Sequence, residues 1–169
     1  MSTTPEEHKS DAPTSIRCAV VTVSDTRTLE TDTGGRTLIE HLEVAGHQVV
    51  LRKIIPDQSQ PMRALLDHCR ESEEIDAVLM TRGTGETARD QTLETVTSYL
   101  TKTLPGYGEL FRLLSYEEIG AAAMLSRATG GLMDRTIVLT MPGSRAAVLL
   151  AMKKLVIPEL SHLVREARR

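Results

Sequence analysis

A glycine-rich segment near the middle of the chain contains the residue types that phosphate groups bind. It reads Thr81, Arg82, Gly83, Thr84 and Gly85. Gly83 and Gly85 carry no side chain, so their backbone amides can approach a phosphate closely, and Thr84 adds a hydroxyl. The segment is neither a P-loop, which requires Gly-Lys followed by Ser or Thr, nor the dinucleotide motif GxGxxG. It predicts a phosphate-binding loop, and an ordinary turn is an equally good interpretation of this segment alone.

Two aspartates, Asp57 and Asp90, are the candidate acids. Phosphoryl or nucleotidyl transfer requires positioning and a hard cation, and Mg²⁺ takes one or two carboxylates together with phosphate oxygens. Asp57 and Asp90 could therefore hold Mg²⁺. From chemistry alone the alternatives are as good, since Asp57 could make an Asx turn and Asp90 could interact with the dipole of a helix that follows it.

The elements that must position these residues alternate between strand and helix. Short apolar runs rich in β-branched residues predict strands at 16–23, 49–55, 76–81 and 135–140. Apolar residues that recur every three to four positions predict helices at 36–45, 59–69, 92–100, 115–128 and 146–155. Such alternation predicts an α/β fold, a single three-layer α/β/α domain with a mainly parallel central sheet.

Local signals set the expected ends of these elements. Residues 24–35 are polar and end in two glycines, which indicates a loop, and Ser59 can cap the helix that follows it. Residues 105–108 indicate a turn, and Ser115 with Glu118 matches a capping box. Pro158 is expected to break the helical pattern before a basic terminal helix.

Ligands of open parallel sheets bind beyond the carboxyl ends of the strands. The candidate functional residues follow those ends. Two helices that are expected to begin near Thr92 and Ser144 present unpaired amides there. This placement predicts a pocket for a phosphorylated ligand. The residues expected to line it are Ser24, Asp25, Asp57, Thr81, Arg82, Gly83, Thr84, Gly85, Pro142, Gly143 and Ser144.

Composition narrows the possible classes of protein. The chain has 169 residues and 18.6 kDa, which fits a single domain at 16–169 after a polar, disordered tail at 1–15. A net charge of −3 and only four aromatic residues argue against nucleic acid as a partner. The longest apolar run, 146–152, is too short to cross a membrane. Two cysteines, Cys18 and Cys69, are far apart, which favours reduced thiols and a cytoplasmic location.

Several motifs together resemble one known family. The segments TRGTG (81–85) and ARDQT (88–92) are similar to the TGGTG…RDxTP signature of the molybdenum cofactor biosynthesis family, which includes the MoaB and Mog proteins and domains of gephyrin. The likeness extends from about residue 20 to 160 and includes VSDTR (23–27), PGYGE (105–109), Ser126-Arg127 and MPGS (141–144). The segment SYEEIG (115–120) followed by MPGS resembles the MoaB branch in particular.

The resemblance implies a function. Members of this family bind molybdopterin, a pterin dithiolene with a terminal phosphate, and the active enzymes adenylylate that phosphate with Mg-ATP and release pyrophosphate. By this resemblance the two functional aspartates are Asp57 and Asp90, residues 81–85 bind phosphate, and the turn 142–144, with Ser126 as a weaker match, binds the pterin. It also implies a homotrimer or homohexamer, and a possible hand-over of product to a molybdenum-insertion protein.

Departures from the family pattern leave alternatives open. Arg82 stands where the family usually has Gly, and Leu93 where Pro usually follows the Thr. With a positive φ, Arg82 would be strained; with a negative φ, its guanidinium can turn over the pocket and meet a phosphate, or point away into solvent. The pocket-facing arrangement is the one we expect. The aromatic-bearing stretch 99–116 is the candidate subunit interface.

Two other functions remain possible from the sequence. One is a protein that binds molybdopterin without catalysis, which predicts pterin affinity and no pyrophosphate release. The other is a hydrolase of another nucleotide, which predicts turnover of ATP or a dinucleotide without any pterin.

Overall fold

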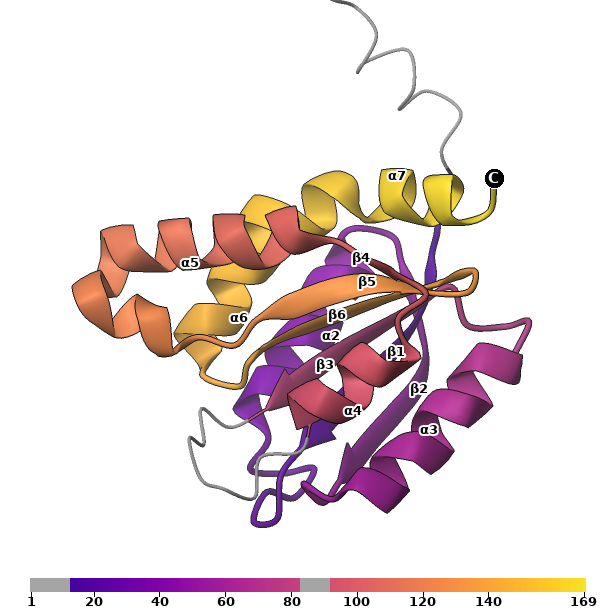
Figure 1. Cartoon of the computed structure of the whole chain (residues 1–169), viewed down its shortest axis with the longest axis horizontal. Helices are drawn as coiled ribbons and strands as arrows, with labels where there is room; N and C mark the ends of the chain where they lie inside the picture. Colours follow the sequence, from indigo (N-terminus) through magenta and orange to yellow (C-terminus); the bar gives the residue numbers. More distant parts are fainter. Residues whose placement is uncertain (1–12, 83–91) are drawn as a thin grey trace, which may run out of the picture.

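A computed structural model describes residues 13–82 and 92–169 of the chain. The described residues form a six-stranded sheet in the order β2-β1-β3-β6-β5-β4 (Figure 1). The four strands β2, β1, β3 and β6 run parallel, and β5 and β4 add an antiparallel edge. The strands are β1 (Arg17–Val23), β2 (Gln48–Ile55), β3 (Ala77–Arg82), β4 (Lys102–Thr103), β5 (Thr129–Met133) and β6 (Thr136–Pro142).

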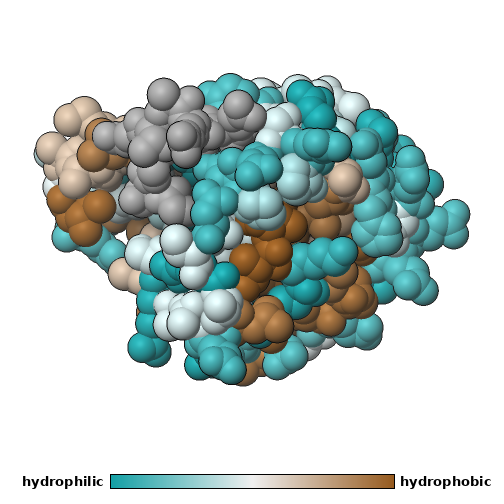
Figure 2. Space-filling model, turned by 90° about the horizontal axis from the view of Figure 1, so that it is seen from below, coloured by the Kyte–Doolittle hydropathy of each residue, from teal (hydrophilic) through white to brown (hydrophobic). Residues whose placement is uncertain are grey.

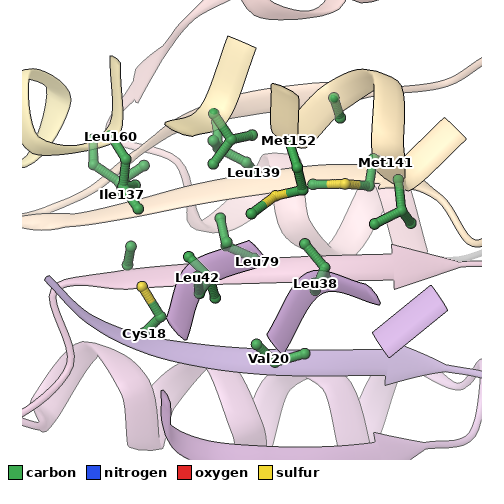
Figure 3. Packing of buried hydrophobic residues seen from close by; sticks show 14 of the residues in the cluster. Cys18, Val20, Leu38, Leu42, Leu79, Ile137, Leu139, Met141, Met152 and Leu160 are labelled. Atoms are coloured by element: carbon green, nitrogen blue, oxygen red, sulfur yellow. The ribbon is translucent and has the colours of Figure 1, made fainter. Parts of the chain in front are cut away.

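Helices cover both faces of the sheet, which confirms the predicted three-layer α/β/α architecture. One face packs against α2 (Thr33–Val44), α5 (Pro105–Ile119), α6 (Arg145–Ala151) and α7 (Ile157–Ala167), and the other against α3 (Ser59–Glu71) and α4 (Thr92–Tyr99). In Figure 3, Val20 and Leu79 of the sheet meet Leu38 of α2 in the first of these layers. The alternation of inward side chains along each buried strand divides the apolar core into these two parts.

Two strands, the edge strand β4 and its neighbour β5, were not predicted. β4 has two residues, and β5 reads TGGLM, whose paired glycines suggest a loop. The glycines allow close approach of neighbouring segments, because a Cβ on Gly130 would lie 2.5 Å from Leu139 Cδ2 and one on Gly131 would lie 2.4 Å from the Lys102 carbonyl oxygen. The predicted parallel part of the sheet is confirmed, and the antiparallel edge is an addition.

Several predicted helix ends were wrong. Helix α2 begins at Thr33, because Asp32 caps it by accepting a hydrogen bond from the Gly35 amide at 2.9 Å. Ser59 lies inside α3, where its hydroxyl accepts a hydrogen bond from Arg63 Nε, so it is not the cap. The expected turn at 105–108 is the first turn of α5, since proline suits the first helical position. Ser115 is buried within α5 and does not begin a helix.

Pro158 does not break the C-terminal helix. A wider turn, η2 (Met152–Val156), joins α6 to α7, and the amide of Ile157 donates to the carbonyl of Met152 five residues earlier. A helical turn that is wider by one residue leaves space for the ring of Pro158. The helix can then continue although Pro158 has no N–H to donate. The chain therefore stays helical from α6 through α7, apart from this local widening.

The two ends of the described chain contact residues that precede the strands β2 and β3. Ser15, the last residue of the predicted tail, donates a hydrogen bond from its hydroxyl to the Gly46 carbonyl at 2.9 Å. At the other end, the Arg168 guanidinium pairs with the buried carboxylate of Asp76, which also accepts from Arg17 at 2.8 Å. Among residues 13–82 and 92–169, no helix is long and apolar enough to cross a membrane.

Candidate functional site

The carboxyl ends of the parallel strands meet at one edge of the sheet, as predicted. Parallel pairing places Val23 of β1 opposite Ile55 of β2 and Arg82 of β3, and Arg82 opposite Pro142 of β6. The carboxyl-terminal residues of these four strands therefore lie side by side. The loop after each strand carries residues that the sequence analysis selected, so the topology brings segments distant in the chain to one edge.

The first two loops are joined by a hydrogen bond between the backbone of Asp57, a candidate acid, and the side chain of Asp25. The Asp57 amide donates to Asp25 Oδ1 at 3.2 Å, and the Ser24 amide donates to the Ile55 carbonyl at 2.9 Å. The Ser24 hydroxyl accepts hydrogen bonds from the amides of Thr26 and Arg27, which stabilises the loop after β1. Asp25 is exposed and Asp57 is half-buried. Two oxygen-rich side chains at a solvent-accessible edge are the kind of donors that Mg²⁺ takes together with phosphate oxygens.

Thr81 faces the protein interior. It is fully buried, and its hydroxyl donates to Thr22 Oγ1 at 3.1 Å. The Thr22 hydroxyl in turn lies 2.6 Å from Asp32 Oδ2. The side chain of Thr81 is thus engaged inside the protein, and its predicted contact with substrate stays a prediction.

Arg82 is the last residue of β3 and is buried, with 7% of its surface exposed. It lies in the extended backbone of a strand, so the strained alternative is wrong. Its burial also excludes the solvated alternative. Arg82 lines a small cavity with Ser126, Arg127 and Pro142, and its predicted contact with a phosphate stays a prediction. Its charge also acts on Glu94 of α4, whose pKa is lowered mainly by a hydrogen bond from Arg127 at 2.5 Å.

The turn after β6 is packed closely against the end of β3 and the start of α2. The Gly143 amide donates to the Arg82 carbonyl at 2.6 Å. A Cβ on Gly34, in the first turn of α2, would lie 2.6 Å from the Gly143 carbonyl oxygen, so a larger residue there would have to displace this turn. Ser144 caps α6 by accepting from the Ala147 amide at 3.3 Å. The structure therefore brings Arg82 and the turn 142–144 into direct contact.

A groove of about 450 Å³ begins at this turn. Ser126 forms one wall together with residues of α5 and of the 3₁₀ turn η1 (Gly120–Leu125). Pro142 and Ser144 of the turn also line it, and the rest of the lining is mostly apolar, including Ile119, Ala122 and Leu125. The groove places Ser126 beside the turn that the sequence analysis assigned to the pterin.

Four predicted site residues, Gly83, Thr84, Gly85 and Asp90, lie outside the described residues. Within the described parts of the chain, no group of three or more His, Cys, Asp or Glu side chains gathers as a metal site. A bound Mg²⁺ would therefore depend on Asp57, on phosphate oxygens of the ligand and on Asp90.

Asp32 is a residue of this edge that the sequence analysis missed. It is 1% exposed, and the guanidinium groups of Arg27 and Arg52 lie 3.9 and 3.8 Å from its carboxylate oxygens. Aspartate is a preferred capping residue, and its carboxylate reaches the amide three residues later, here that of Gly35. This signal could have placed the start of α2. The cap was not predicted, because the polar composition of residues 24–35 indicated a loop over the whole segment.

The fold and this edge define a class of protein: a three-layer α/β domain whose candidate ligand site lies at the carboxyl ends of its parallel strands. The family model described as a probable molybdopterin binding domain matches residues 19–162. Molybdenum cofactor biosynthesis protein B of Bacillus subtilis (strain 168) is 51% identical over 166 residues, 97% of each chain.

Solved structures of molybdenum and tungsten cofactor biosynthesis proteins are also similar to this chain. A crystal structure of a molybdenum cofactor biosynthesis protein B superposes with a TM-score of 0.88 at 46% identity, covering 94% of this chain and 99% of that one. The tungsten cofactor synthesizing protein MoaB from Pyrococcus furiosus superposes with a TM-score of 0.82 at 35% identity, covering 94% and 100%. The chain belongs to this molybdopterin-binding family of cofactor biosynthesis proteins.

Proposed function

We propose that the protein adenylylates the terminal phosphate of molybdopterin with Mg-ATP and releases pyrophosphate. The observation that supports this most is the direct contact between the loops of Asp25 and Asp57, at the edge where Arg82 meets the turn 142–144. This arrangement places carboxylates, a cation and an apolar groove along one rim. Nucleotidyl transfer depends on positioning and on neutralising phosphate charge, and carboxylates that hold a cation, together with an arginine, can supply both.

In the proposed reaction, an oxygen of the molybdopterin phosphate attacks the α-phosphorus of ATP, and pyrophosphate leaves. Asp57, together with Asp90, would hold Mg²⁺, which neutralises phosphate charge when bound. Arg82 would bind a phosphate oxygen through its guanidinium, which suits an anion better than an ammonium does. The groove beside Ser126 and Ser144 would hold the flat pterin against apolar walls, with these hydroxyls to bind its polar edge.

The decisive experiment is incubation of the protein with molybdopterin, Mg²⁺ and labelled ATP, followed by detection of an adenylylated pterin. Asp57→Ala should lower its rate of formation by at least about 10²-fold, about 2.7 kcal/mol of transition-state stabilisation. Asp67→Ala is the control, because Asp67 is a half-buried aspartate of α3 that pairs with Arg70 and contacts Tyr99, and it does not follow the carboxyl end of a strand. Full activity of Asp57→Ala would remove this residue from the mechanism.

The same experiment separates the two rival functions. Binding of the pterin without pyrophosphate release would indicate a non-catalytic molybdopterin-binding protein. Turnover of ATP without any pterin would indicate a nucleotide hydrolase. Adenylylated pterin as the product supports the proposed transferase, and hand-over to a molybdenum-insertion protein would then follow this step.

We also propose that the protein assembles with copies of itself, as a trimer or hexamer, through α5 and η1. Large apolar side chains are exposed along this segment: Leu110, Leu113, Tyr116, Ile119, Met124 and Leu125. Figure 2 shows hydrophobic residues gathered at that end of the molecule. An apolar patch of this kind on a small protein is typical of an interface.

The aromatic stretch 99–116 contributes only part of this surface. Phe111 is buried, and Tyr99 lies against Arg63 and Arg70 of α3, whereas Tyr116 is 61% exposed. Light scattering should give a mass about three times 18.6 kDa or more, reduced by Leu113→Glu. A mass near 18.6 kDa for the unmodified protein at micromolar concentration would contradict assembly.

A further inference from the structure

A directed chain of buried hydrogen bonds connects three segments beneath the candidate site. The Thr81 hydroxyl donates to Thr22 Oγ1 at 3.1 Å, and the Thr22 hydroxyl lies 2.6 Å from Asp32 Oδ2. An ionised carboxylate can only accept, so Thr22 must direct its proton to Asp32 and offer its lone pairs to Thr81. The other oxygen, Asp32 Oδ1, accepts from the Gly35 amide at 2.9 Å. The carboxylate therefore orients both hydroxyls and the start of α2.

Both sides of this chain end at the same turn. Thr81 precedes Arg82, whose carbonyl accepts the Gly143 amide at 2.6 Å. On the other side, Gly34 in the turn that Asp32 caps packs against the Gly143 carbonyl. A shift of either segment would therefore move the turn that follows β6, which carries part of the proposed pterin site.

We propose that Asp32 is a positioning residue of the candidate site, acting through Thr22 and Thr81 to hold the end of β3 and the turn at Gly143 in register. This inference rests on the proposed function for its effect on catalysis. A small displacement of groups that align two substrates lowers the rate strongly, even when the protein remains folded.

The charge of Asp32 is required for this role. Asparagine at this position would keep the cap, with its carbonyl oxygen on the Gly35 amide, and would turn its amide group toward Thr22. Thr22 would then have to accept, and the order of donors up to Thr81 would reverse. The guanidinium groups of Arg27 and Arg52 lie 3.9 and 3.8 Å from the carboxylate oxygens of Asp32 and balance its negative charge. They are not part of the chain of hydroxyls.

The test separates the cap of α2 from the chain of hydroxyls. Thr22→Val keeps the size of the side chain and the hydrogen bond that the Gly35 amide donates to Asp32 Oδ1, and it removes both hydrogen bonds of the Thr22 hydroxyl, with Asp32 and with Thr81. Thr37→Val is the matched control, because Thr37 is also buried and its hydroxyl donates only to the carbonyl of Thr33 within α2.

We expect Thr22→Val and Asp32→Asn each to lower kcat for adenylylation about tenfold, with KM for ATP changed by less than about twofold. Because both act through one chain, the double variant should be no slower than the slower single variant. Thr37→Val should stay within about twofold of the unmodified protein. Equal rates for Thr22→Val and Thr37→Val, or additive losses in the double variant, would overturn the proposal.

Amide hydrogen exchange gives a second measurement that does not depend on the reaction. The Gly143 amide should exchange about tenfold faster in Thr22→Val than in Thr37→Val, because its acceptor, the Arg82 carbonyl, is no longer held in place. If the unmodified protein forms no adenylylated product, the proposed function fails and the exchange rates still decide the positioning role. Unchanged exchange at Gly143 would refute that role by itself.

Discussion

Gly34 and Gly106 occupy the same position in two helices, the second residue of α2 and the second residue of α5. Their surroundings differ. A Cβ on Gly34 would lie 2.6 Å from the Gly143 carbonyl oxygen, whereas nothing lies within 4 Å of a Cβ on Gly106. The same substitution, Gly→Ala, should therefore change the free energy of unfolding in opposite directions at the two positions.

The magnitudes follow from two effects. Replacing glycine with alanine at a helical position stabilises a protein by about 0.4–1 kcal/mol, because the unfolded chain loses freedom. Inserting a methyl group where backbone must move costs about 1–3 kcal/mol. Gly106→Ala gains only the first effect. Gly34→Ala experiences both, because the opposing atom is a backbone oxygen, and we expect a net loss of about 1–2 kcal/mol.

Urea unfolding and thermal melts at one fixed protein concentration measure both variants. A change of 1 kcal/mol shifts the Tm of a domain of this size by about 2–4 °C, so Gly34→Ala should melt about 2–8 °C lower and Gly106→Ala about 1–4 °C higher. Gly34→Ala should also weaken pterin binding, because it displaces the turn at Gly143. If Gly34→Ala were as stabilising as Gly106→Ala, the close packing of α2 against this turn would be refuted.

Three further predictions concern single side chains. Arg82→Gly should lose about 1.5–3 kcal/mol of binding free energy for ATP or molybdopterin, the range for a charged hydrogen bond, and unchanged affinity in calorimetry would refute it. Burial lowers the pKa of His47, whose Nδ1 accepts the Ile16 amide at 3.2 Å, so the folded state binds this proton less readily than the unfolded chain. The free energy of unfolding should therefore fall as the pH drops below about 6.5, a dependence that His47→Asn should reduce in urea titrations. Burial raises the pKa of the Cys18 thiol to about 12 and of the Cys69 thiol to about 11, so both should react with a thiol reagent only on unfolding; rapid reaction of the native protein would contradict their burial.

Much of the fold could be predicted because its signals are local. The apolar, β-branched runs of β1, β3 and β6 and the amphipathic periodicity of α3 appear within short segments, and alternation then requires a parallel sheet. The failures have tertiary causes. The glycines of β5 allow a neighbouring strand to approach closely. Pro158 follows a widened helical turn, in which the Ile157 amide donates to the carbonyl of Met152 five residues earlier.

The sequence by itself determined which residue types lie at the carboxyl edge of the sheet, because each motif directly follows a segment that the sequence predicts to be a strand. Only the tertiary structure decided which of them face inward. Thr81 donates to Thr22, 59 residues away, and Arg82 is buried beside Ser126 and Pro142. A hydroxyl or guanidinium binds whichever partner the fold brings within about 3 Å, and segments so far apart in the chain meet only after the sheet has formed.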